Sequence, residues 1–208
     1  MTEIKLCPAK VLHALAGFAN PKDLRPQLRG VWVENSPRGL ILHATNGVTL
    51  AALRVGERAP CESFDLLLPH AEIKGLPKND KPVNLRMTPY SLVQYGLGLP
   101  WEPDLEMRPV QWRRVTPKDV SHQLAQFDFT QLARFTALAK ALGRRNPGVL
   151  RLSHNGDGTA RVHVPNHPEF VGAITPLRPV CFEAADAWTF NPEWLFDTPP
   201  ADDAEGLT

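Results

Sequence analysis

The spacing of apolar residues along the first part of the chain predicts one strand, one helix and three further strands. Residues 3–7 have the character of a short strand, and Pro8 suits the first turn of a helix, where its missing N–H costs nothing. Apolar residues then recur at helical spacing until Asn20-Pro21 ends the pattern. Strand-like stretches separated by turn signals follow over residues 30–34, 40–45 and 49–55.

The same order of elements repeats twice more. A strand over 64–68 and a short helix over 69–76 precede three stretches of strand character, at 83–87, 91–96 and 105–110. After Pro117 the strongest helix pattern covers 127–143, and three strands are expected at 149–153, 160–164 and 170–175. The chain therefore holds about three β-α-β-β-β half-units, which predicts an α+β fold built by internal symmetry. We assign residues 1–117 to a complete domain, 118–198 to a second, shortened or half domain, and 199–208 to an acidic tail.

Composition is that of a folded protein. The 208 residues are 43% hydrophobic and 22% charged, which is sufficient for a core. No apolar run approaches the ~20 residues of a membrane span, and the first residues lack the apolar stretch of a signal peptide. We therefore expect a cytoplasmic protein without membrane contact. The three cysteines, Cys7, Cys61 and Cys181, are far apart and form no CxxC pair, so buried free thiols are expected instead of a disulfide framework or a zinc site.

Charge is distributed unevenly along the chain. Residues 1–178 contain all 23 Lys and Arg residues and 15 acidic residues, whereas residues 179–208 contain seven acidic residues and no basic one. In the helix predicted at 127–143, apolar residues occupy one side and basic residues the other. A basic body suits a polyanionic partner, while the acidic end either shields that body or keeps the protein soluble.

Catalytic and metal-binding motifs receive little support from the sequence. His163 and His167 have the spacing of a helical metal pair, but Pro165 between them argues against a regular helix. Residues 155–158 are better explained as a hairpin turn than as a calcium loop, because the other EF-hand ligands are missing. No Walker, Gly-x-Ser-x-Gly or Gly-x-Gly-x-x-Gly string is present. We expect no enzyme, no cofactor and no metal site.

Three strings resemble the central domain of the bacterial DNA polymerase III beta subunit, the sliding clamp family. They are KDLRPQLRGV at 22–31, HATNGVTLA at 43–51 and QWRRVTP at 111–117. They resemble the family's Asp-x-x-Arg-x-x-Leu-x-Gly, Ala-Thr-Asp-Gly-His-Arg-Leu-Ala and Pro-Asp-Tyr-Arg-Arg-Val-x-Pro segments, in the same order. A weaker similarity to the first half of the third domain covers GVLRL at 148–152 and FNPEWL at 190–195.

The resemblance implies clamp domains and a DNA sliding clamp, or processivity factor, that encircles duplex DNA during replication. The chain departs from the family at Asn46, Val48 and Thr49, where Asp, His and Arg are usual. It also lacks counterparts of the family's first domain and of the closing half of its last. A homo-oligomeric ring would need four chains if each unfinished half paired with a copy of itself. It would need three if residues 179–208 completed a shortened second domain, and a dimer stays open.

A clamp binds DNA through cations that attract phosphates without reading bases. The candidates for this role share a basic side chain in or near a predicted helix or in the first string. They are Lys10, Lys22, Arg25, Lys74, Lys78, Arg134, Lys140, Arg144 and Arg145.

The resemblance further implies a hydrophobic pocket for short peptides of the DNA polymerase and the clamp loader. Carried over residue by residue, the pocket residues are Arg25, Leu28, Thr45, Gly47, Leu50, Val110, Arg114 and Val115. The apolar members of this set also suit a sheet core. The strand that completes the pocket in the family is either absent or replaced here by residues 173–176. An alternative function is a clamp-fold regulator that binds a host clamp, loader or polymerase without forming a DNA-encircling ring.

Overall fold

The computed structural model describes residues 2–87, 93–95 and 107–177. Residues Met1–Pro176 form one compact unit. Half of the predicted strand at 91–96, the start of the one at 105–110, Cys181 and the acidic tail at 199–208 lie outside the described residues. The predicted domain boundary at residue 117 stays a prediction.

The described elements follow the predicted order closely. The first half-unit consists of β1 (Thr2–Pro8), α1 (Ala9–Ala16), β2 (Gly30–Ser36), β3 (Gly39–Thr45) and β4 (Thr49–Gly56), with a 3-10 turn, η1, at Pro26–Leu28. The second comprises β5 (Phe64–Pro69), α2 (His70–Gly75), β6 (Pro82–Met87) and β7 (Val93–Tyr95). The third comprises α4 (Phe129–Ala141), β8 (Arg151–Ser153), β9 (Ala160–His163) and β10 (Phe170–Ile174).

The first two half-units exchange their first strands. β1 pairs with β6 of the second half-unit, and β5 pairs with β2 of the first, both antiparallel. Each exchanged strand ends in a proline and leads directly into a helix. The amide of Ala9 donates to the carbonyl of Lys81 at 3.0 Å, and the amide of His70 donates to that of Arg29 at 2.9 Å. Both acceptors directly precede the strand that receives the exchanged one, so the two halves repeat the same junction.

A seven-stranded sheet connects the first and third half-units, in the order β5-β2-β3-β4-β10-β9-β8. Antiparallel pairing of β4 with β10 joins them, from Leu53 opposite Phe170 to Thr49 opposite Ile174. The order is symmetric about this pair, except that no described strand lies beyond β8 as β5 lies beyond β2. Residues 118–128, which precede α4, contain no strand. The third half-unit is therefore open where the first is complete.

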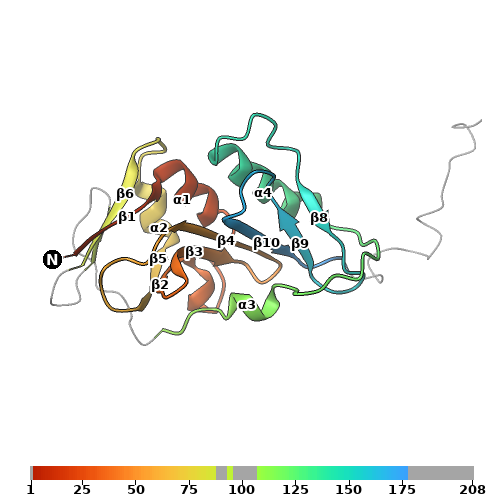
Figure 1. Ribbon diagram of the computed structural model, residues 1–208, viewed down its shortest axis with the longest axis horizontal. Helices are drawn as coiled ribbons and strands as arrows, with labels where there is room; N and C mark the ends of the chain where they lie inside the picture. Colours follow the sequence, from red (N-terminus) through yellow and green to blue (C-terminus); the bar gives the residue numbers. More distant parts are fainter. Residues whose placement is uncertain (1, 88–92, 96–106, 178–208) are drawn as a thin grey trace, which may run out of the picture. The chain divides into compact units, whose positions relative to one another are not determined.

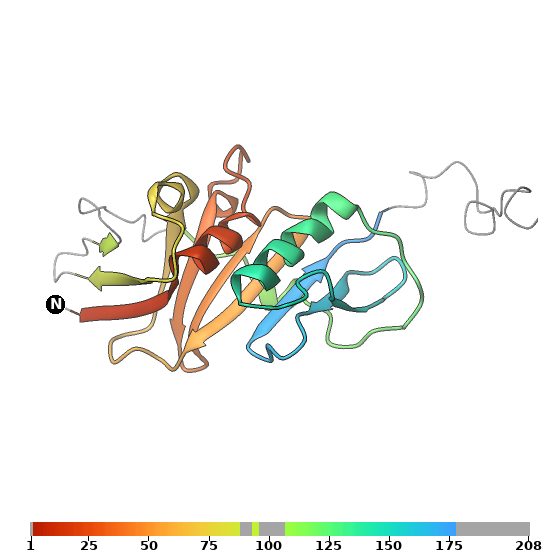
Figure 2. The same cartoon turned by 90° about the horizontal axis from the view of Figure 1, so that it is seen from above.

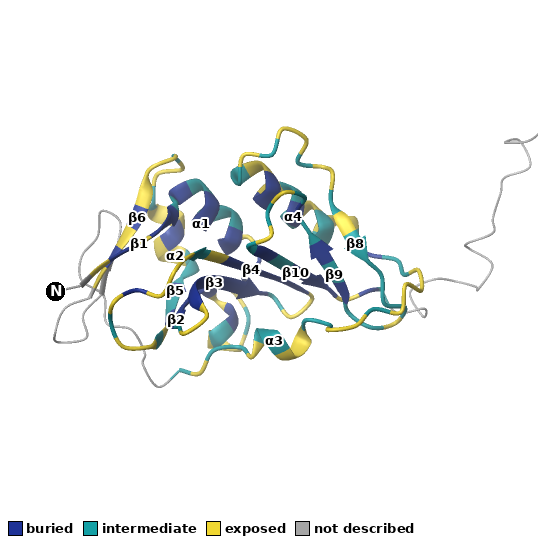
Figure 3. Cartoon of the chain, viewed as in Figure 1, coloured by how far each residue is buried: buried dark blue, intermediate teal, exposed yellow. Residues whose placement is uncertain are grey.

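Helices α1, α2 and α4 cover one face of this sheet, and α3 (Trp112–Val115) lies on the other, outer face (Figure 1). Seen from above, α1 lies between α2 and α4, in agreement with its contacts to both (Figure 2). The helices and the sheet bury the core between them (Figure 3). Phe135 of α4 contacts the ring of Phe18, with centroids 4.8 Å apart, and that of Phe170 at 6.4 Å. None of the helices in the described ranges is long and apolar enough to cross a membrane.

The strand expected at 105–110 needs correction. Residues 107–110 do not form a strand, and they are followed by helix α3, which the pattern did not predict. A helix of four residues is too short to show periodicity, so the tertiary contacts of Trp112 and Arg113 determine its position.

Cys7 is buried and Cys61 half-buried, and both are free thiols.

Candidate functional site

A cavity of about 520 Å³ opens on the outer face of the sheet. Its floor includes Leu50 of β4 and Ala173 of β10, which are 2% exposed and belong to the small outer-face cluster. Seven of the eight predicted pocket residues line it: Arg25, Leu28, Thr45, Gly47, Leu50, Val110 and Val115. We call this space the apolar cavity. Five segments distant in the sequence meet there, because the fold brings them together.

The lining of the apolar cavity and the predicted pocket set are not identical. Arg114 lines a neighbouring cavity and not this one. Arg108, Thr159 and Ala173, together with Thr175, also line the apolar cavity. For the family's last pocket strand the sequence left two alternatives, absence or replacement by residues 173–176; this segment includes the end of β10 and contributes Ala173 and Thr175 to the cavity lining. No sequence pattern pointed to Arg108 or Thr159, since both come from segments without regular structure.

The turn at the rim of the apolar cavity is closed by the side chains of Thr45 and of Asn46, the second of which departs from the family pattern. Asn46 Oδ1 accepts the amides of Val48 at 2.9 Å and Thr49 at 2.7 Å. Thr45 Oγ1 accepts the amide of Gly47 at 3.0 Å and donates to the carbonyl of Thr49 at 2.7 Å. Gly47 has φ of +89°, which a side chain would strain. Asn46 therefore supplies the oxygen that closes this turn.

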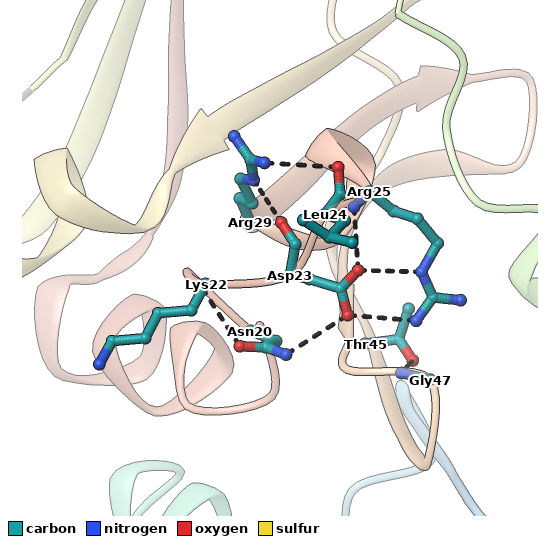
Figure 4. Close-up of polar contacts among 8 residues, drawn as sticks. All are labelled: Asn20, Lys22, Asp23, Leu24, Arg25, Arg29, Thr45 and Gly47. Carbon is teal, nitrogen blue, oxygen red and sulfur yellow. Dashed lines mark hydrogen bonds and ion pairs between the residues drawn. The ribbon is translucent and has the colours of Figure 1, made fainter.

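Arg25 is held at the same rim by Asp23 (Figure 4). Arg25 Nε donates to Asp23 Oδ1 at 2.9 Å and a terminal nitrogen donates to Oδ2 at 3.1 Å. The side-chain hydrogen bonds from Arg25 lower the pKa of Asp23 to about 2. Asn20 Nδ2 also donates to this carboxylate, at 3.3 Å. Asp23 was not among the predicted site residues, although it lies two residues before Arg25 in the first family-like string.

A larger cavity of about 1050 Å³ lies next to the apolar one and shares Arg108, Pro109 and Val110 with it. Two carboxylates, Glu34 and Asp65, and three arginines, Arg108, Arg113 and Arg114, line it, so we call it the polar cavity. Arg113 of α3 binds Glu34 in a bidentate pair, with distances of 2.8 and 2.7 Å. Burial opposes ionisation of Glu34, but the hydrogen bonds from Arg113 and others outweigh it and lower the pKa of that carboxyl.

Aromatic contacts fix α3 on the outer face. The ring of His43 stacks on Trp32 with centroids 6.3 Å apart and contacts Trp112 at 5.9 Å. The Arg113 guanidinium lies 4.2 Å from the Trp112 ring centre, a cation–π contact. Burial lowers the pKa of His43 to about 4, so its ring is neutral at physiological pH. Residues of α3 line both cavities, so these contacts position a helix that the two cavities share.

The predicted DNA-binding residues divide into available and engaged side chains. Lys22, Lys74, Lys78, Lys140 and Arg145 are exposed and form no ion pair with any described residue. Lys10 pairs with Asp80, and Arg134 donates to the carbonyl of Gly17. Arg144 is half-buried, and Arg25 lines the apolar cavity on the outer face. The helix face therefore presents fewer available cations than the sequence pattern indicated.

Within the described ranges, no three His, Cys, Asp or Glu side chains are grouped so that they could hold a metal ion. His163 lies on β9, while His167 contacts Glu169 Oε1 at 2.7 Å through Nδ1. Residues 155–158 form the turn between β8 and β9, closed by the Gly158 amide donating to the Asn155 carbonyl at 2.9 Å. This geometry agrees with the hairpin interpretation.

Solved structures similar to this chain are DNA polymerase III beta subunits. The one from Pseudomonas aeruginosa superposes with a TM-score of 0.62 at 13% identity, covering 86% of this chain and 67% of that one. The Borrelia burgdorferi subunit, solved with a natural product, gives 0.62 at 12%, covering 85% and 62%. The C. crescentus beta sliding clamp gives 0.61 at 14%, covering 85% and 66%. The chain thus spans about two thirds of their length, and no protein-family model or curated protein matches it.

Proposed function

We propose that this chain, which has the fold of the bacterial DNA polymerase III beta subunit, is a sliding clamp that encircles duplex DNA as a homo-oligomer. Its apolar cavity would bind short hydrophobic peptides of the polymerase and the clamp loader. The observation that carries this proposal is the separation of two surfaces by one sheet. Three helices with basic side chains cover one face, and the apolar cavity opens on the other.

The helix face suits a duplex that moves along it. Lys74 of α2 and Lys140 of α4 are exposed, and Arg145 follows α4 closely in the chain. Long flexible cations on rigid helices attract phosphates without fixing a base sequence, as a mobile tether requires. Because few cations are available, such binding would be weak and strongly dependent on salt.

The apolar cavity suits a peptide anchor. Leu28, Leu50 and Ala173 form a buried apolar floor, and Arg25 at the rim is oriented by Asp23. Peptide-binding surfaces commonly combine an apolar slot with a few positioned polar groups. Leu50→Asp would place a charge in this floor and abolish peptide binding. Circular dichroism would distinguish a binding defect from a folding defect.

The topological part of the proposal is tested with nicked circular plasmid. The oligomer mass is first measured by light scattering, and the protein is then mixed with the plasmid and separated by gel filtration. A trimer or tetramer that stays with the circle and leaves after linearisation supports the clamp. A monomer or simple dimer without retention contradicts it and favours the regulator that binds a clamp, loader or polymerase.

The DNA-binding face is tested with charge reversal at exposed positions. Lys74→Glu, Lys140→Glu and Arg145→Glu together should abolish DNA association without unfolding the chain. A matched triple variant at Arg38, Arg58 and Lys118, which lie outside α1, α2 and α4, should retain it. Removing one cation that binds a phosphate should also reduce the slope of log affinity against log salt by about 0.9. If both triple variants bind DNA equally, the helix face is not the lining.

A further inference from the structure

The charged residues that line the apolar cavity all carry the same sign. Arg25 and Arg108 line it, and none of the described residues in its lining is acidic. The buried floor of Leu50 and Ala173 favours apolar side chains, whereas the two guanidinium groups favour a negative charge. A nucleic-acid backbone would supply the charge but no apolar group. A peptide with neighbouring apolar and acidic side chains supplies both.

The two arginines differ in how far their charge is already compensated. Arg25 donates to both carboxylate oxygens of Asp23, at 2.9 and 3.1 Å. Arg108 is exposed and forms no ion pair with any residue in the described ranges. Its guanidinium therefore has hydrogen-bond donors available for a ligand. The uncompensated positive charge of the apolar cavity is thus concentrated on Arg108.

The polar cavity does not compensate this charge. Glu34 and Asp65 line the polar cavity but not the apolar one. Glu34 is occupied by its bidentate pair with Arg113, at 2.8 and 2.7 Å. Because Arg108 and Arg114 line the polar cavity as well, three arginines stand there against two carboxylates. Positive charge is therefore in excess around Arg108.

Arg108 is placed to reach a peptide that lies in the apolar cavity. It lines both cavities together with Pro109 and Val110, so it lies where the two adjoin. We infer that the peptide bound in the apolar cavity carries an aspartate or glutamate beside its apolar residues, and that Arg108 binds this carboxylate. Guanidinium groups can bind a carboxylate through two parallel hydrogen bonds. The inference rests on the proposed peptide-binding function and adds a charge requirement to it.

The test uses fluorescein-labelled synthetic peptides and fluorescence anisotropy. All peptides share the apolar segment Leu-Ala-Leu-Phe and an amidated C-terminus, and carry Glu, Gln or Lys before or after this segment, separated from it by up to four glycines. At the best spacing, the Glu peptide should bind about two- to fivefold more tightly than its Gln counterpart, a modest factor because Arg108 is exposed. The Lys peptide should bind more weakly than both. Raising the salt concentration should reduce the preference for Glu.

Substitutions at Arg108 assign this preference to one side chain. Arg108→Gln should abolish the difference between the Glu and Gln peptides. Arg108→Glu should reverse the order, so that the Lys peptide binds most tightly, a result that a general loosening of the cavity would not produce. Arg145→Gln serves as the matched control and should keep the original order, because Arg145 is also exposed and without an ion pair to any described residue, but lines neither cavity.

The outcomes separate this inference from the proposed function. Equal binding of the Glu and Gln peptides at every spacing would overturn the inference alone. A preference for Glu that survives Arg108→Gln, or an order that Arg108→Glu does not reverse, would do the same. Absence of binding by every peptide would overturn the peptide-binding function together with it.

Discussion

The two ends of the seven-stranded sheet differ in one strand. At one end β2 is paired on both sides, by β3 and by the exchanged strand β5. At the other, its counterpart β8 pairs with β9 and ends the sheet among the described residues. Every residue of β2 except the last is buried, whereas in β8 Arg151 is exposed and the other two residues are half-buried.

This difference shows that a half-unit does not complete its own sheet. The strand that buries β2 comes from the following half-unit, and the first strand of its own half-unit leaves to join β6. Exposed apolar residues occur in both regions, at Leu24 and Val48 in the first half-unit and at Leu124, Phe129 and Val149 in the third. The completed end of the sheet is therefore built by a pair of half-units, and the third half-unit joins it through the pairing of β10 with β4.

The largest effect is expected where the open end joins the rest of the molecule. Phe135→Ala should lower the free energy of unfolding by about 3–5 kcal/mol, because its ring packs between Phe18 and Phe170 and is 0% exposed. Phe129→Ala, on the same helix but 85% exposed, should change it by less than about 0.5 kcal/mol. Urea denaturation measures both. Equal effects would mean that α4 is not anchored by this aromatic contact.

A pair of glycines compares the two ends of the sheet directly. A Cβ on Gly30, at the start of β2, would lie 2.1 Å from the backbone oxygen of Leu68, whereas one on Gly148, before β8, meets nothing within 4 Å. Gly30→Ala should therefore cost about 3 kcal/mol of stability and Gly148→Ala less than about 0.5 kcal/mol. Thermal melting of the two variants checks this. A tolerated Gly30→Ala would indicate that β5 can shift away from β2.

A smaller effect on stability is expected from the buried imidazole of His43, at the end of the sheet where β2 is paired on both sides. The folded chain holds the pKa of His43 at about 4 against 6.5 when unfolded, so the unfolded chain binds more protons between these values. Stability should therefore fall as the pH decreases through this window, by about 2 kcal/mol at pH 5. The carboxyl of Asp23, with a pKa of about 2, titrates below it.

His43→Phe serves as the control for this pH effect, because it keeps an aromatic ring between Trp32 and Trp112 and removes the titrating group. Urea denaturation at pH 7 and pH 5 should show a markedly smaller difference in the variant. An unchanged difference would assign the pH dependence to other groups, such as His163 at the open end, whose pKa burial also lowers.

Much of the fold was predictable because its signals are local. Pro8 before α1 and the Asn46-Gly47 turn gave element types and order directly from the sequence. The exchange of β1 and β5 was not predictable, since periodicity identifies a strand but not its partner. Helix α3 was missed because its position depends on Trp112 reaching His43 and Arg113 reaching Glu34, contacts between residues about 70 to 80 positions apart along the chain.

The apolar cavity was largely predictable by resemblance, and Leu50 and Val115 do line it. The polar cavity was not, because Glu34 and Asp65 become neighbours only through the exchanged strand. The hydrogen bonding of the α4 cations was not predictable for a similar reason. A helical wheel places Arg134 off the apolar stripe, but cannot show that the neighbouring helix offers it the carbonyl of Gly17.

The pairing of β4 with β10 has a consequence for how the chain reaches this state. Thr49 and Ile174 are roughly 120 residues apart in the chain, and closing so long a loop slows folding. During synthesis, β4 cannot pair with β10 until nearly all of the compact unit has left the ribosome. Until then it presents unpaired backbone groups beside Leu50 and Ala52, a surface that invites aggregation or chaperone capture.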